Sequence, residues 1–167
     1  MDAELRQAVR AVRPYRLVAD EDLDQLLREV TVREAPAGAT LFEEGDPTDG
    51  VAAVLEGQVD VVRDGRVLAT LGPGSVLGEL SLFLPSAART ATATATSDVR
   101  MITWPATGLA ERLARHERLA TAVVADLAQV LADRLDRRTT DLVDLLAVVG
   151  RRLPVAELDR LRSRVVE

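Results

Sequence analysis

Two short stretches near the start of the chain repeat their apolar residues at the spacing of an α-helix. They cover residues 3–12 and residues 20–29. In the second stretch the apolar positions are Leu23, Leu26, Leu27 and Val30. This spacing places them on one helical face, and Asp20 has the acceptor side chain typical of an N-cap. The pattern therefore predicts two short N-terminal helices.

From Thr31 the pattern changes to short segments of β-strand type, separated by glycine-rich turns. The predicted strand segments are Thr40–Glu44, Val51–Glu56, Gln58–Arg63, Arg66–Leu71, Ala91–Thr96 and Asp98–Trp104. Asp64-Gly65 lies between two alternating runs, which is a strong signal for a two-residue hairpin turn. Many short strands at regular spacing favour a β-barrel or jelly roll over an α/β sheet. We expect a short helix near Glu79–Phe83 to interrupt the strands.

After Pro105 the helical spacing returns. It predicts one helix over residues 106–115 and a long one over residues 117–149, with Gly150 as its C-cap. A last short helix is expected over residues 154–163. The apolar stripe of the long helix consists of Leu119, Val123, Leu127, Val130, Leu131, Leu135, Leu142, Leu145 and Leu146.

The whole pattern predicts an α+β chain. A small antiparallel β-barrel or jelly roll follows short N-terminal helices and precedes a long C-terminal helical tail. The corresponding division is 1–30 for the N-terminal helices, 31–104 for the barrel and 105–167 for the C-terminal helices, which we expect to act as a lid or in dimerisation.

Composition narrows the function classes. The chain has 167 residues, 47% of them hydrophobic and 29% charged, as in a soluble globular protein. It has no cysteine, which excludes iron–sulfur clusters and Cys-ligated zinc, and its one histidine, His116, cannot form a histidine cluster, so ligands for a haem or iron–sulfur sensor are lacking. The net charge of -6 argues against a dominant nucleic-acid surface. The N-terminal residues lack the apolar core of a signal peptide, and no run reaches the roughly 18 apolar residues of a membrane span. We therefore expect a cytoplasmic protein without membrane contact, metal or cofactor.

The richest chemistry lies between Gly78 and Ala95. A helix that begins near Gly78 leaves N–H groups that favour an anion, and glycine lets a phosphate approach the backbone. Arg89 offers a planar fork for two phosphate oxygens, and Thr90 adds a hydroxyl beside it. Glu79, when ionised, only accepts hydrogen bonds, which suits a sugar hydroxyl. The stretch predicts recognition of a small molecule that carries both a phosphate and a hydroxyl.

Together with Gly38, Gly45 and Gly57, the run GELSLF followed by ARTATATA resembles the phosphate-binding segment of a known family. The chain is similar, over about residues 12–149, to cyclic-nucleotide-binding domains of the catabolite-activator (Crp/Fnr) type. The resemblance implies the cyclic-nucleotide-binding fold and cyclic AMP, cyclic GMP or both as ligand. It places Glu79 on the ribose, Arg89 and Thr90 on the cyclic phosphate, and the amides of Gly78 and Leu80 beside it. The predicted ligand-binding set is Gly78, Glu79, Leu80, Arg89, Thr90 and Ala91.

Two departures from the family pattern concern the pocket. Ala88 stands where many relatives have proline, and Ala93 where a larger valine is usual, so the wall under the phosphate is less filled. The base is expected to be capped by the long helix. Arg138, Thr139 and Thr140 are the candidates for that contact, with a polar exposed turn as the alternative reading.

Other readings of the same residues stay open. Arg89 is on its own a common surface charge, Glu79 suits the dipole of any first helical turn, and the two side chains are able to pair with each other. A ligandless scaffold or dimerisation domain of the same fold is the alternative function. An enzyme is not expected, because the chain lacks the G-x-S-x-G, P-loop and zinc motifs and a Ser/His/Asp set.

The C-terminal helices suggest how the chain passes on a signal. We expect a regulatory sensor that signals through these helices and forms a homodimer through residues 117–149, the alternative being that this face folds back on the barrel. Transcription factors of the family place a helix-turn-helix after the long helix. Residues 151–167 are too few for one, so we expect no direct DNA binding and, instead, an effect on a protein partner.

Overall fold

The computed structural model describes residues 3–12, 15, 18–83 and 88–150. Contacts between residues divide the chain into two units, Met1–Ala128 and Gln129–Glu167. The first unit holds all the described strands and the start of the last helix. The second unit continues that helix from Gln129.

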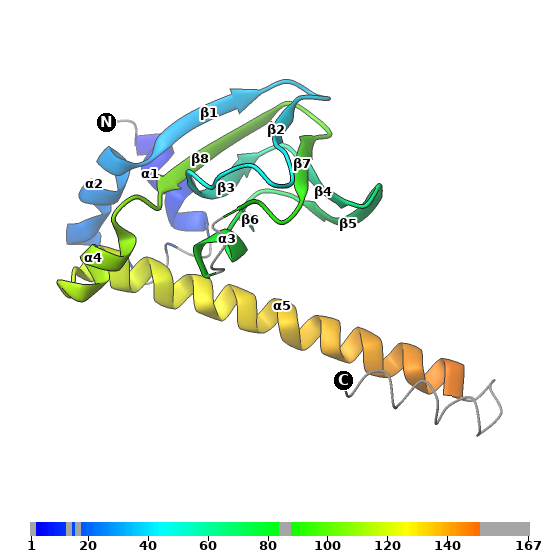
Figure 1. Ribbon diagram of the computed structural model, residues 1–167. Coiled ribbons are helices and arrows are strands. Elements are labelled where there is room, and N and C mark those ends of the chain that lie inside the picture. The colour runs from blue at the N-terminus through cyan, green and yellow to red at the C-terminus, as the bar shows by residue number, and fades with distance from the viewer. Residues whose placement is uncertain (1–2, 13–14, 16–17, 84–87, 151–167) are drawn as a thin grey trace. The chain divides into compact units, whose positions relative to one another are not determined.

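Eight described strands form two antiparallel four-stranded sheets (Figure 1). The first sheet has the order β1 (Thr31–Ala35), β8 (Val99–Pro105), β3 (Gly50–Glu56) and β6 (Val76–Leu77). The second sheet has the order β2 (Thr40–Phe42), β7 (Thr92–Ala95), β4 (Val59–Arg63) and β5 (Arg66–Leu71). The predicted fold class, a small antiparallel jelly roll with helices at either end of the chain, is confirmed.

Each of the predicted strand segments corresponds to a strand of these sheets, but β1 and β6 lie outside those segments. Four of the five residues of β1 are exposed, so this edge strand lacks the alternation that marks a half-buried strand. β6 is two residues long and pairs with Ala52 and Ala53 of β3. Such a short strand is specified by its tertiary partner and leaves no periodic signal.

The predicted hairpin at Asp64-Gly65 is confirmed. β4 and β5 pair antiparallel up to Arg63 and Arg66, and the two turn residues have φ angles of 50° and 69°. Two successive positive φ angles are those of a type I′ turn, whose twist matches the flanking strands. The register shifts once, between Val61 and Val62.

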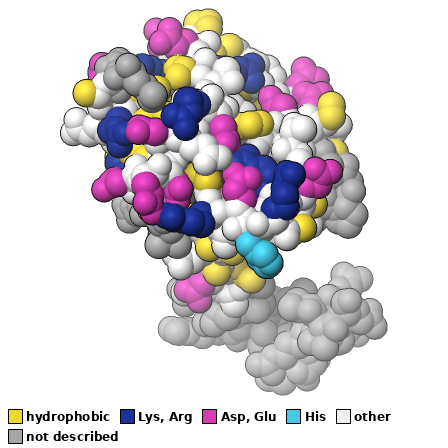
Figure 2. Space-filling view, turned by 90° about the vertical axis from the view of Figure 1, so that its left-hand side faces the viewer, with side chains coloured by type: hydrophobic (Ala, Val, Ile, Leu, Met, Phe, Trp, Pro, Cys, Tyr) yellow, Lys and Arg dark blue, Asp and Glu magenta, His cyan; other side chains and the backbone are white. Residues whose placement is uncertain are grey.

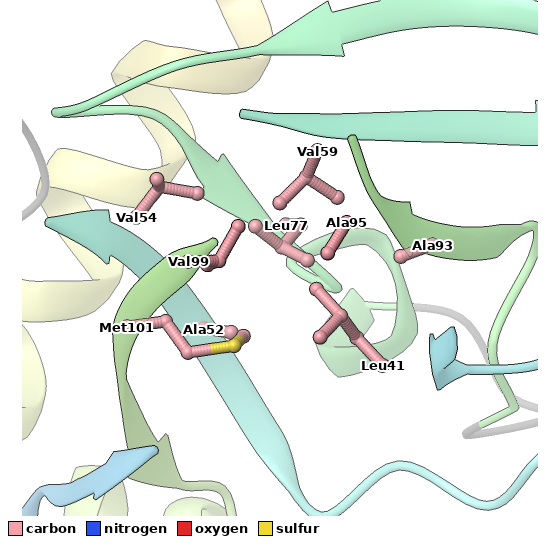
Figure 3. Close-up of a cluster of buried hydrophobic side chains, with 9 residues drawn as sticks. All are labelled: Leu41, Ala52, Val54, Val59, Leu77, Ala93, Ala95, Val99 and Met101. Atoms are coloured by element: carbon pink, nitrogen blue, oxygen red, sulfur yellow. The ribbon is translucent and has the colours of Figure 1, made fainter. Parts of the chain in front are cut away.

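A cluster of small and medium-sized apolar side chains fills the space between the strands (Figure 3). Its members are Leu41, Ala52, Val54, Val59, Leu77, Ala93, Ala95, Val99 and Met101. Full burial of a valine, leucine or methionine stabilises a fold by about 1.5–3 kcal/mol. Ala93, where the family usually has a larger residue, is fully buried in this cluster.

The described helices are α1 (Ala3–Ala11), α2 (Asp20–Glu29), α3 (Leu80–Phe83), α4 (Leu109–Ala114) and α5 (Arg118–Gly150). All five predicted helices over these parts of the chain are confirmed, whereas the one expected over residues 154–163 lies outside the described residues. The prediction of Asp20 as an N-cap is wrong, because Ala19 is the cap and Asp20 is the first helical residue. There its charge still favours the helix dipole.

Acidic residues of α2 pair with arginines of neighbouring elements. Asp24 accepts from Arg6 and Asp20 from Arg10, both on α1, and Glu21 accepts from Arg118 at the start of α5. Figure 2 shows acidic and basic side chains lying next to one another on this end of the molecule. None of the described helices is long and apolar enough to cross a membrane.

Candidate functional site

A left-handed turn at Gly78 connects β6 to α3. The φ angle of Gly78 is 81°, and a Cβ placed there would lie 1.8 Å from Nη1 of Arg89 and 3.0 Å from its Cζ. Both the backbone conformation and the contact therefore disfavour a side chain at this position, which would displace the Arg89 guanidinium. The structure brings Gly78 and Arg89, two residues of the predicted site, directly together.

The backbone around Arg89 is pinned to the loop between β2 and β3. The amide of Arg89 donates to the carbonyl of Asp46 at 2.8 Å, and the amide of Gly45 donates to the carbonyl of Arg89 at 2.8 Å. Next to them, Pro47 and Ala88 form an antiparallel bridge. This pairing holds the start of the Arg89 side chain in place before any ligand contact is considered.

The guanidinium of Arg89 is oriented by three further contacts. Nη1 donates to the carbonyl of Gly50 at 3.0 Å, and Nη2 donates to Oδ1 of Asp49 at 2.5 Å. Its Cζ lies 4.2 Å from the centre of the Phe42 ring. The Arg89 side chain is only 4% exposed, whereas that of Asp49 is 63% exposed. The reading of Arg89 as a solvated surface charge is therefore wrong.

Burial and nearby negative charge shift the pKa of Arg89 in opposite directions. Burial lowers the pKa of its guanidinium, and the carboxylates of Asp49 and Asp46 partly offset this effect. An arginine remains protonated even so, because its pKa starts far above neutrality. The group is a buried cation whose counter-charge within the protein sits mainly on one exposed carboxylate. A guanidinium has five N–H groups, and the side-chain hydrogen bonds to the described residues Gly50 and Asp49 use one on each terminal nitrogen.

A pocket of about 340 Å³ opens at this guanidinium. Its lining residues are Arg33, Leu41, Phe42, Asp46, Pro47, Asp49 and Arg89. Arg33 on β1 brings a second guanidinium close enough to lower the pKa of Arg89. The pocket thus combines an aromatic ring with two cations and two carboxylates.

The other predicted site residues lie on the two segments that meet here. Glu79, next to Gly78, is buried with 3% of its surface exposed, and Ala91 is also buried. Thr90 is half-buried, whereas Leu80 at the start of α3 is 44% exposed. The carboxylate that Arg89 binds at 2.5 Å belongs to Asp49. The ligand roles of these residues stay predictions.

Sequence reasoning missed the residues that orient Arg89, namely Asp49, Gly50 and Phe42. Asp49-Gly50 is a turn-type pair, and it lies about 40 positions from Arg89 along the chain. No local pattern links segments so far apart. The available signal was chemical. A buried arginine needs hydrogen-bond acceptors, and Asp49-Gly50 offers a side-chain carboxylate and a backbone carbonyl.

The three candidates for base contact lie in α5, within the second unit. Arg138, Thr139 and Thr140 are exposed, and the two threonine hydroxyls donate to the carbonyls of Leu135 at 2.9 Å and Asp136 at 3.0 Å. These residues are exposed, as the alternative reading expects, but they lie in a helix and not in a turn. Their contact with a base stays a prediction.

Comparison with known proteins gives a consistent result. Residues 32–116 match the family described as cyclic nucleotide-binding domain. The chain is 33% identical over 126 residues to the CRP-like cAMP-activated global transcriptional regulator of Mycobacterium tuberculosis, an alignment that covers 72% of this chain and 54% of that protein. It therefore spans about half the length of that relative.

Two solved structures show the same fold. The catabolite activator protein of Thermus thermophilus has a TM-score of 0.64 at 31% identity, covering 81% of this chain and 63% of that one. A cyclic nucleotide-binding domain from Methylobacillus flagellatus has a TM-score of 0.69 at 25% identity, covering 84% and 82%. The matched family, the jelly roll and the glycine–arginine pair agree, and the chain belongs to the cyclic-nucleotide-binding domain family, in its catabolite-activator (Crp/Fnr) type.

Proposed function

We propose that this chain is a regulatory module that binds cyclic AMP, cyclic GMP or both at the segment from Gly78 to Ala91, and that it signals through its C-terminal helices. The observation that carries the proposal is Arg89. It is a buried guanidinium, packed against a glycine and oriented by the protein, with fork N–H groups left for an anion. A cyclic phosphate carries one negative charge and two outer oxygens, which matches one such fork.

The remaining contacts follow from the positions of the neighbouring residues. With the phosphate on the remaining N–H groups of Arg89, the amides of Gly78 and Leu80 and the hydroxyl of Thr90 are the further donors that the proposal assigns to it. The buried carboxylate of Glu79 accepts from the ribose hydroxyl. Such a set recognises sugar and phosphate more strongly than the base.

Titration calorimetry tests the proposal. Cyclic AMP, cyclic GMP, cyclic CMP and cyclic UMP are titrated into the whole chain and into Arg89→Gln. We expect micromolar or tighter binding of cyclic AMP or cyclic GMP. Loss of the charge-assisted fork costs about 2–4 kcal/mol, so the variant should bind roughly 30- to 1000-fold more weakly.

Arg28→Gln is the matched control, because it removes an exposed arginine of α2 and should leave the affinity unchanged. Equal affinity of wild type and Arg89→Gln would remove Arg89 from the site. No heat with any of the four nucleotides would favour the ligandless scaffold. Binding of a cyclic pyrimidine nucleotide alone would keep the site and change the base class.

The proposed signalling depends on α4 and α5, the helices that follow the barrel. The Mycobacterium tuberculosis relative is named as a cAMP-activated transcriptional regulator, and this chain spans 54% of it. We propose that nucleotide binding rearranges α4 and α5, that two copies pair through α5, and that a protein partner reads the change. Leu135, 69% exposed on α5, marks the apolar stripe for such pairing. Light scattering of wild type and Leu135→Gln should show a dimer that the substitution weakens.

The proposed role involves no reaction. After incubation with the chain, chromatography should recover each cyclic nucleotide unchanged. A hydrolysed or transferred product would show an enzyme and overturn this part of the proposal.

A further inference from the structure

A half-buried polar cluster lies where α2, the end of β8, α4 and the start of α5 meet (Figure 1). It consists of Gln25, Glu29, Trp104, Arg112 and Glu117, and we call it the Arg112 cluster. All of these residues belong to the first unit. The cluster is separate from the segment proposed to bind nucleotide.

Arg112 on α4 is held by two carboxylates in forked geometry. Its Nη1 and Nη2 donate to Oε2 and Oε1 of Glu29 at 3.0 and 3.1 Å. Its Nε donates to Oε2 of Glu117 at 2.9 Å, and Nη2 also donates to Oε1 of Glu117. The Arg112 side chain is 13% exposed. Paired forks of this kind are among the strongest and most directional side-chain contacts.

Glu29 on α2 also binds the barrel. The indole Nε1 of Trp104 donates to Oε2 of Glu29 at 3.0 Å, and the Arg112 guanidinium lies 5.2 Å from the centre of the indole ring. Trp104 is fully buried. Gln25 donates to Glu29 at 2.9 Å and to Glu117 at 3.1 Å. One carboxylate therefore ties the end of β8 to α4, and any displacement of Trp104 alters the acceptor of Arg112.

Trp104 in turn contacts the residue that orients Arg89. Gly50 pairs with Pro105 and Val51 with Trp104 across β3 and β8. A Cβ on Gly50 would lie 2.1 Å from the carbonyl oxygen of Trp104, so the two backbones are in close contact. The carbonyl of Gly50 is the acceptor for Nη1 of Arg89 at 3.0 Å. Direct contacts thus run from Arg89 through Gly50, Trp104 and Glu29 to Arg112.

We propose that the Arg112 cluster couples occupancy of Arg89 to the position of α4, a proposal that rests on the proposed function. An anion that binds the remaining N–H groups of Arg89 draws the guanidinium toward itself, lengthens the hydrogen bond to the carbonyl of Gly50 and so loosens the backbone contact of Gly50 with Trp104. The hydrogen bond from Trp104 to Glu29 then no longer fixes the acceptor of Arg112, and α4 separates from α2 and β8. A coupling element requires two discrete arrangements, which here are the Arg112 fork made, as in the structure, and the fork released, as the proposal expects with nucleotide bound.

The first test needs no nucleotide. Hydrogen exchange is compared in wild type, Glu29→Gln and Arg112→Lys, the last of which keeps the charge and loses the fork. We expect faster exchange in α2 and α4 together and unchanged exchange in β4 and β5. Arg118→Met is the matched control, since it removes ion pairs from α2 as well, namely those of Glu21 and Asp22 with an exposed arginine at the start of α5. Faster exchange confined to α4 would overturn the proposal that the cluster is one unit.

The second test uses Trp104, the single tryptophan of the chain. Nucleotide added to wild type should change its emission and speed α4 exchange, saturating at the concentration where calorimetry saturates. Because coupling is reciprocal, Glu29→Gln should bind nucleotide on the order of 5-fold more tightly, with no further change in emission or α4 exchange.

The outcomes separate the two proposals. Nucleotide binding to wild type with unchanged Trp104 emission and α4 exchange, or weaker or equal binding by Glu29→Gln, overturns the coupling and leaves the proposed function intact. Absence of any binding to wild type overturns the proposed function and the coupling with it. The exchange comparison without nucleotide then still decides whether the cluster is one unit.

Discussion

Arg89 and Arg112 are both largely buried arginines that lie over an aromatic ring, yet they are built differently. Arg112 meets two carboxylates in its own fold, and hydrogen bonds to Glu117 and Glu29 raise its pKa despite burial. Arg89 meets one exposed carboxylate and a backbone carbonyl, and burial lowers its pKa. Among the described residues, two carboxylates hydrogen-bond to the first cation, whereas one exposed carboxylate, Asp49, hydrogen-bonds to the second.

This difference teaches how to separate a structural cation from a binding one. The Arg112 fork gains little from an added anion, because each of its three nitrogens already donates to a carboxylate. A buried cation with little negative charge around it gains both an opposite charge and hydrogen-bond acceptors when it binds an anion. The counter-charge around each arginine, more than its burial, therefore distinguishes Arg112, which is held within the fold, from Arg89, which we propose binds a ligand.

The largest expected effect comes from removing each arginine in turn. Arg112→Met leaves two carboxylates facing each other and should lower the free energy of unfolding by about 2–3 kcal/mol, less than a fully buried pair because the site is partly exposed. Arg89→Met should change it by less than about 1 kcal/mol, because Asp49 is solvated and Thr48 still donates to the carbonyl of Gly50. Urea denaturation followed by circular dichroism measures both.

Calorimetry with the nucleotide that wild type binds completes the pair of measurements. Arg89→Met should lose binding, whereas Arg112→Met should retain it at a temperature where the variant is folded. If Arg89→Met proved the more destabilised variant, the distinction between the two arginines would not hold.

A smaller effect concerns how the Glu117–Arg112 contact makes the free energy of unfolding depend on pH. Hydrogen bonding from Arg112 lowers the pKa of Glu117 below its ordinary value of 4.5. A carboxyl whose pKa is lower in the folded state stabilises the protein above the unfolded pKa, and this contribution is lost as the pH falls through the folded pKa. Glu117→Gln should cost about 1 kcal/mol at neutral pH, after allowance for solvent screening.

The difference between wild type and Glu117→Gln should shrink as the pH falls below about 4.5. Urea denaturation at several pH values between neutrality and acid measures it. A difference that stays constant over this range would mean that packing, and not charge, makes Glu117 matter.

How far the sequence predicts each region follows from how local its partners are. The Arg89 segment is predictable because Gly78, Glu79 and Arg89 lie within a dozen residues and form a recognisable motif. The hairpin at Asp64-Gly65 is predictable for the same reason, since its two turn residues determine its geometry.

The Arg112 cluster was not predictable in this way. Arg112 and Glu29 are 83 positions apart, and Trp104 and Glu29 are 75 apart, so only the folded sheet brings them together. Asp49 behaves likewise, because its sequence context indicates a turn and its role depends on Arg89, 40 positions away. Charged residues on short helices look solvated in a sequence, and their burial is decided by tertiary packing.

The smallest expected effect concerns the negative charge of Asp49, which partly neutralises Arg89 and repels a phosphate bound there. Asp49→Asn keeps an oxygen acceptor for Nη2 of Arg89 and removes a negative charge from the edge of the pocket. At a separation of several ångströms in a mostly aqueous setting, that charge repels a phosphate by about 0.5–1 kcal/mol. The variant should therefore bind nucleotide roughly two- to five-fold more tightly at low salt, with the gain fading as salt increases.

Asp49→Ala separates charge from orientation in the same measurement. It removes the charge and the acceptor together, so Arg89 loses the contact that aims its fork, and the gain in affinity seen for the asparagine variant should disappear. Calorimetry of both variants at two salt concentrations decides the matter. Weaker binding by both variants would mean that the negative charge of Asp49 holds the fork in place, so that the protein tolerates a repulsive charge beside its ligand in order to keep Arg89 oriented.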